Sequence, residues 1–127
     1  MEYLVESSKS FSEVVFELTP IVQRLGFVVF HHEDLGESLR RHGDDYDEDS
    51  AVFLIDCYPL LDALLTAAPS SSLALPTRLA VFTRDGATWI GCQRPSAQLG
   101  DLAGNGLVAR LAGELEARLI QIIDEAR

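Results

Sequence analysis

The chain has 127 residues, 47% of them hydrophobic, and a formal net charge of −10 at pH 7. This length suffices for a buried core without disulfides or metals, so we assign residues 1–127 to a single domain. The acidic charge and the lack of a Lys/Arg-rich run argue against binding to nucleic acid or to an anionic membrane. No basic leader precedes an apolar run, and no stretch approaches the roughly 20 apolar residues of a membrane span. The sequence therefore favours a cytoplasmic protein.

Hydrophobic periodicity and capping signals predict helices and strands in alternation. Ser10 and Glu13 form a capping-box pattern ahead of a helix that Gly26 ends, and Asp34 with Glu37 repeats the pattern ahead of a helix that ends at Gly43. Pro59 suits the first position of a third helix. The other predicted elements are strands at residues 3–6, 27–31 and 51–57, an acidic loop at 44–49, a polar loop at 69–72, a short helix after Ser96, a turn at 104–106 and a long amphipathic helix from Leu107.

A β-hairpin at residues 75–95 is the clearest local prediction. Asp85-Gly86 between two β-rich runs is typical of a two-residue type I′ turn, and this turn sets the pairing of the two strands. One face then carries an Ala80/Gly91 dip, large aromatic residues on the side of the turn, and Arg78 and Gln93 on the other side. A dip beside a cation is suited to an anionic ligand, but it could equally seat a helix or a second subunit.

The order of elements is β-α-β-α-β-α-β-β-α. It predicts an α+β fold with two layers, in which helices cover one face of a mainly antiparallel sheet of about five strands. The other face of the sheet then needs a cover, which favours a homodimer.

The segments that carry a family resemblance are Gly26-Phe27, residues 31–35, Cys57-Tyr58-Pro59, residues 75–78, Asp85-Gly86 and Pro95. Through them the chain resembles the bacterial family called domain of unknown function 302 over nearly its whole length. Relatives usually have Cys-Asn-Pro at 57–59 and often have Leu-Pro-Cys-Arg at 75–78, where this chain has Thr77. The resemblance implies a small, often dimeric α/β fold and no agreed activity.

Cys57 and the pair His31 and His32 form the first candidate site, because each lies at the end of a predicted strand. A cysteine with one histidine could bind a soft metal or haem iron. Cys57 also precedes a proline-started helix, where the helix dipole would favour a nucleophilic thiolate. The simpler interpretation is that Cys57 is a small buried hydrophobe and that the histidines end a strand.

Arg78 and the helix start at Tyr58-Pro59 form the second candidate site. A guanidinium facing free backbone N–H groups would suit a carboxylate, phosphate or sulfur oxyanion. The alternative is that Arg78 forms a structural ion pair with Asp56 or Asp34. Trp89 could contribute to a ligand site but fits the core or a dimer contact better, since no basic groove accompanies it.

No catalytic motif is present: the sequence lacks a nucleophile elbow, a P-loop, a dinucleotide fingerprint and a zinc-protease helix. It therefore identifies no cofactor and favours a homodimeric ligand-binding or accessory module for a small anionic ligand over an enzyme. The alternative function is thiol, metal or haem chemistry centred on Cys57.

Overall fold

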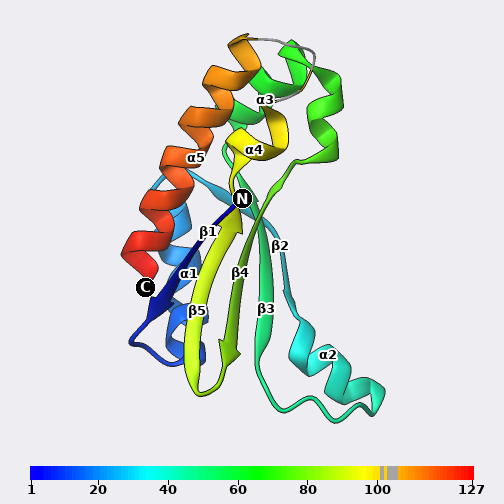
Figure 1. Ribbon diagram of the computed structural model, residues 1–127, viewed down its shortest axis with the longest axis vertical. Coiled ribbons are helices and arrows are strands. Elements are labelled where there is room, and N and C mark those ends of the chain that lie inside the picture. The colour runs from blue at the N-terminus through cyan, green and yellow to red at the C-terminus, as the bar shows by residue number, and fades with distance from the viewer. Residues whose placement is uncertain (101, 103–105) are drawn as a thin grey trace.

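The computed structural model describes residues 1–100, 102 and 106–127, and Figure 1 shows its arrangement. The helices and strands follow in the order β1 (Glu2–Ser7), α1 (Phe11–Arg24), β2 (Val28–Asp34), α2 (Leu35–His42), β3 (Ser50–Asp56), α3 (Tyr58–Ala67), a 3-10 helix (Pro69–Leu73), β4 (Thr77–Arg84), β5 (Ala87–Gln93), α4 (Pro95–Leu99) and α5 (Gly106–Ala126). The turn predicted at residues 104–106 falls largely outside the described residues.

The strands form one five-stranded sheet in the order β1-β5-β4-β3-β2, and every neighbouring pair is antiparallel. The predicted α+β architecture is therefore confirmed. The hairpin pairing is also confirmed, because Ala80 lies opposite Gly91 and Phe82 opposite Trp89. Both turn residues have the positive φ that a type I′ turn requires, 53° at Asp85 and 81° at Gly86.

In Figure 1, α1 lies behind the strands, α5 runs along their left-hand side, and α3 and α4 lie above the upper end of the sheet. The long α5 buries an apolar stripe that includes Leu115 and Leu119. Fully buried side chains of the central strands, such as Phe53, Leu79 and Ile90, belong to the same core. The opposite face of the sheet carries no helix in the described part of the chain, and we call it the open face.

Helix ends follow the capping signals in the sequence. Ser10 and Glu13 form the reciprocal capping box at the start of α1, and the Asp34 carboxylate accepts the Glu37 backbone N–H at the start of α2. Gly26 and Gly43 end these helices with positive φ, at 85° and 102°.

The second strand is longer than the sequence predicted. It was expected to end at His31, whereas β2 continues to Asp34 with a bulge between Val29 and His31. The predicted polar loop at residues 69–72 is a short 3-10 helix.

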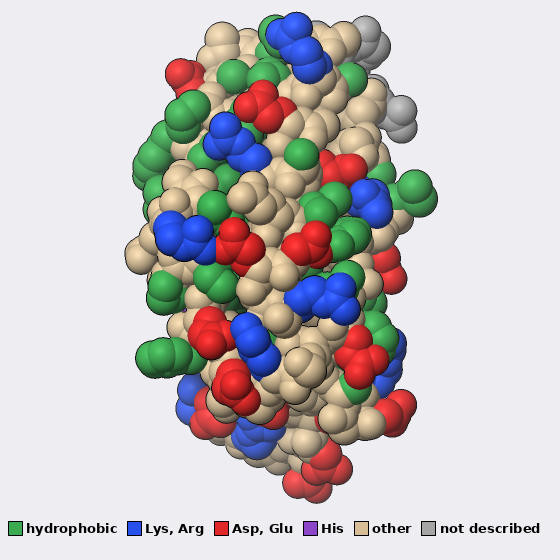
Figure 2. Space-filling model, turned by 90° about the vertical axis from the view of Figure 1, so that its left-hand side faces the viewer, with side chains coloured by type: hydrophobic (Ala, Val, Ile, Leu, Met, Phe, Trp, Pro, Cys, Tyr) green, Lys and Arg blue, Asp and Glu red, His purple; other side chains and the backbone are tan. Residues whose placement is uncertain are grey.

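Charges of both signs are mixed on the side of the molecule turned to the viewer in Figure 2, without a continuous basic area. None of the helices that the structure describes has the length and apolar character that crossing a bilayer would demand.

Candidate functional site: a groove on the open face of the sheet

The open face holds a groove of about 640 Å³, within the size range of small-ligand sites. Four strands form its floor, and the segment before β4 contributes a wall. The lining residues are Glu2, Leu4, Leu54, Leu73, Ala74, Leu75, Pro76, Thr77, Arg78, Ala80, Phe82, Arg84, Gly91, Cys92, Gln93 and Gln98. The groove contains the predicted dip and the predicted arginine.

Strand register orders the floor of the groove into rows. The first, which we call the polar row, consists of Glu2, Gln93 and Arg78. Glu2 lies opposite Gln93, and continuing the β4–β5 register by one residue brings Gln93 opposite Arg78. Side chains of alternate residues share a face, so all of these project from the open face.

The next row lies two residues closer to the hairpin turn, and we call it the small row. It consists of Leu4, Gly91 and Ala80. Its two central residues have almost no side chain, which makes the floor low between Leu4 and Val52. A Cβ atom on Gly91 would lie 2.5 Å from the Tyr3 carbonyl oxygen and 2.8 Å from a Leu4 methyl. Glycine is therefore required here by the close approach of β1.

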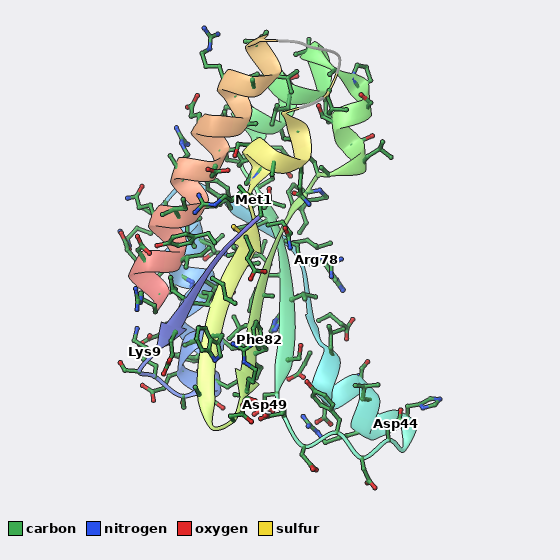
Figure 3. All side chains as sticks on the ribbon, viewed as in Figure 1. Met1, Lys9, Asp44, Asp49, Arg78 and Phe82 are labelled. Atoms are coloured by element: carbon green, nitrogen blue, oxygen red, sulfur yellow. The ribbon has the colours of Figure 1, made fainter. Side chains whose placement is uncertain are left out.

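Phe82 borders the groove on the side of the hairpin turn. Phe82 lies opposite Trp89, and the Arg84 guanidinium carbon lies 4.8 Å from the centre of the Trp89 ring and 5.9 Å from that of Phe82. These distances correspond to cation–π contacts, so Arg84 is already engaged with the protein. Figure 3 shows Phe82 low on the sheet and Arg78 higher, toward the helices.

Arg78 and Arg84 are both exposed, but the Arg78 side chain makes no ion pair, hydrogen bond or cation–π contact within the described part of the chain. The expected alternative was an ion pair with Asp56 or Asp34. Neither forms: Asp56 accepts the backbone N–H of Cys57 at 2.9 Å, and Asp34 caps α2. Arg78 is thus a cation at the rim of a groove, available for an anion.

The predicted companions of Arg78 do not join it. Tyr58 and Pro59 do not line the groove, and the Tyr58 ring instead packs edge-on against Phe30, with ring centroids 5.8 Å apart. Trp89 lies on the open face but outside the lining, beneath Arg84. The start of α3 is therefore not part of this site.

The structure separates Cys57 from both histidines. His31 lies opposite Leu54 and His32 opposite Phe53, in the middle of β3, whereas Cys57 follows the end of that strand. The reason is that β2 runs antiparallel to β3, so the end of β3 meets the beginning of β2. His32 stacks on the Phe53 ring at 4.1 Å, and His31 lies 3.3 Å from the Glu33 carboxylate.

No cluster of three or more His, Cys, Asp or Glu side chains suited to a metal ion occurs among the described residues. Cys57 is 1% exposed and belongs to the core cluster. Cys92 is also buried, and burial raises the pKa of its thiol to about 11, with a further contribution from Glu116. Its thiol is therefore held in the unreactive protonated form at neutral pH.

Asp56 is the buried carboxyl of the chain that lacks a full set of partners. It is 0% exposed; one oxygen accepts the Cys57 N–H, and the other has no hydrogen-bond partner in the described structure. Burial raises its pKa from 3.8 to about 6, and the hydrogen bond from Cys57 opposes this only in part.

Sequence reasoning missed several parts of the groove: Glu2, Leu4, Leu54, Gln98 and residues 73–76. Glu2 and Leu4 belong to the site because β1 pairs with β5, a contact between the two halves of the chain. Only the apolar alternation of β1 signalled a strand, and it did not reveal the neighbour of that strand.

Comparison with known proteins places the chain in a family. The model of the family described as "Domain of unknown function DUF302" matches residues 3–126, so the chain belongs to this family. A crystal structure of an uncharacterized conserved DUF302 protein from Bacillus stearothermophilus has a TM-score of 0.92 and 23% sequence identity, covering 99% of this chain and 98% of that one. This likeness shows that the fold is shared. A search of curated proteins gives no match.

Proposed function

We propose that this DUF302 protein is a homodimeric binding module that holds a small, partly apolar anion in the groove of its open face. The observation that carries the proposal is the unpaired Arg78 at the rim of a groove of about 640 Å³, beside the apolar part of its floor. A guanidinium forms strong, bidentate hydrogen bonds with carboxylate or sulfonate groups. The floor beside it, Ala80 and Gly91, leaves room for an apolar body.

The polarity of the groove supports this ligand class. Small-ligand sites combine a mainly apolar lining with a few polar groups that set orientation. Here Leu4, Leu54 and Phe82 supply apolar walls, and the polar side chains gather at one end. Arg84, held over two aromatic rings, adds positive potential at the other end.

Anilinonaphthalene sulfonate is a suitable probe because it joins an anionic group to apolar rings and becomes fluorescent in apolar sites. Titration of the folded protein should give saturable binding. Arg78→Ala should weaken it about tenfold, corresponding to one charge-assisted contact of roughly 1.4 kcal/mol.

Arg110→Ala is the matched control, since Arg110 is an exposed arginine on α5 and does not line the groove. It should leave the binding of the probe unchanged. Equal weakening by both substitutions would mean that the probe responds to net charge alone, and unchanged binding in Arg78→Ala would remove the groove from the proposal.

The dimer is proposed because the open face is uncovered and apolar residues remain accessible on it. Leu73, at the rim of the groove, is 88% exposed. A second copy packed on this face would shield Leu73 and roof the groove. Sedimentation at micromolar concentration should show a dimer that Leu73→Asp weakens, and a monomeric wild-type protein would contradict this part of the proposal.

A further inference from the structure

The polar row of the groove carries a negative charge, on Glu2, as well as a positive charge, on Arg78. Glu2 and Arg78 flank Gln93 on the same face of the sheet, on strands that are separated by β5. The Glu2 side chain is exposed and, like that of Arg78, has no ion pair or hydrogen bond among the described residues. The groove therefore offers one free carboxylate and one free guanidinium, carried by strands whose spacing the sheet fixes.

That spacing suits a ligand with two opposite charges. Neighbouring strands are about 4.8 Å apart, so the backbones that carry Glu2 and Arg78 are about 9.6 Å apart. Strand side chains stand roughly perpendicular to the sheet, which keeps the two charges apart. An α-amino acid places its ammonium nitrogen about 2.5 Å from its carboxylate carbon. With a hydrogen bond of about 2.8 Å at each end, its head group spans a gap of this size.

The small row lies directly beside the polar row and provides space for a side chain. Ala80 and Gly91 form its floor, Leu4 borders it, and Phe82 ends it on the side of the hairpin turn. An aliphatic side chain leaving the bound head group would cover this floor and reach the Phe82 ring. Ala80, Gly91 and Leu4 offer no polar side chain to a ligand group that lies over them, so a charged group there would lose its hydration without compensation, and the Arg84 guanidinium lies beyond them over the Phe82 ring.

We infer that the groove recognises a free α-amino acid with an apolar side chain, its carboxylate on Arg78, its ammonium on Glu2 and its side chain over Ala80 and Gly91. This inference rests on the proposed function, because it assigns a ligand class to the same groove. It adds a specific role for the Glu2 carboxylate. A site for simple anions does not need this carboxylate, which would repel them.

The test compares L-leucine with two analogues that each lack one charge, by isothermal titration calorimetry on the purified full-length protein. Isocaproate has the carboxylate and the same side chain but no amine, and isoamylamine has the amine but no carboxylate. L-leucine should bind at least about tenfold more tightly than either analogue, the effect expected from one additional charge-assisted contact.

Substitutions identify the two charges separately. Glu2→Gln should weaken L-leucine about tenfold and leave isocaproate binding unchanged or stronger, whereas Arg78→Ala should weaken both ligands. Ala80→Leu should fill the small row and weaken L-leucine by a similar factor. Glu6→Gln is the matched control, since Glu6 lies on the same strand outside the groove lining, and it should change nothing.

The outcomes separate this inference from the proposed function. Equal affinity for isocaproate and L-leucine, or no effect of Glu2→Gln, would overturn the amino-acid assignment while leaving an anion site at Arg78. Failure of L-leucine to bind a protein that still binds anilinonaphthalene sulfonate through Arg78 would overturn it as well. Loss of Arg78-dependent binding for every probe would overturn both.

Discussion

The two faces of the sheet differ in burial and in charge. On the covered face, side chains such as Phe53, Leu79 and Ile90 are completely buried beneath α1 and α5. On the open face, side chains such as Leu4, Leu54 and Phe82 are partly exposed, and Arg78 keeps a charge without a partner among the described residues. An antiparallel sheet commonly leaves one face to solvent, so the proposed binding role of the open face rests on its groove and on Arg78 rather than on its exposure alone.

The comparison predicts that the same chemical change has very different effects on the two faces. Phe53→Ala on the covered face should lower the free energy of unfolding by about 3–5 kcal/mol, because it leaves a cavity in a closed core. Phe82→Ala, on the half-buried open face, should cost less than about 1.5 kcal/mol. Urea unfolding of both variants measures this contrast, and equal losses would mean that the open face is part of the core.

Asp56 provides a second test of how fully the core is buried, because it is a buried acid at the end of a core strand. Its pKa is raised to about 6 in the folded protein, so the folded state holds the proton more tightly than the unfolded state. Its contribution to stability is complete below pH 3.8 and is lost as the pH rises through about 6. Between those limits the wild-type protein should lose roughly 2–3 kcal/mol that Asp56→Asn does not lose.

Thermal unfolding of the wild-type protein and of Asp56→Asn across this pH range gives the difference between their slopes. The other acids titrate in both proteins and cancel in the difference. Parallel curves would show that the Asp56 carboxyl is hydrated in the folded state.

Cys57 should show the smallest effect on function, because its thiol is 1% exposed and lies outside the groove. Iodoacetamide should modify Cys57 far more slowly in the native protein than in denaturant, at a rate limited by opening of the structure. Cys57→Ser should leave the binding of anilinonaphthalene sulfonate within about twofold of wild type. Rapid alkylation of the native protein would instead support the thiol chemistry considered from the sequence.

Local signals in the sequence predict those features whose conformation depends on residues close together in the chain. Asp85-Gly86 set the hairpin register, and therefore the Ala80/Gly91 dip with Arg78 beside it, because a two-residue turn fixes which residues face each other. The caps at Ser10 and Asp34 were likewise correct, since a helix end is satisfied by residues only three positions away.

Contacts between segments that are far apart in the chain could not be predicted from such local signals. The pairing of β1 with β5 brings Glu2 into the groove, and no local pattern specifies that neighbour. The antiparallel pairing of β2 with β3 separates both histidines from Cys57, because the beginning of β2 and not its end lies beside the end of β3. Tyr58 and Pro59 were grouped with Arg78 through the α3 start, whose placement depends on packing at the end of the sheet.

The most direct test of the central claim, that the open face is the binding face, is to map the bound probe by amide chemical shifts in solution. Titration with anilinonaphthalene sulfonate should shift the amide signals of residues 78–82 and 91–93, and leave those of Cys57 and the first turn of α3 in place. Shifts concentrated around Cys57 and α3, with the hairpin unaffected, would contradict the account.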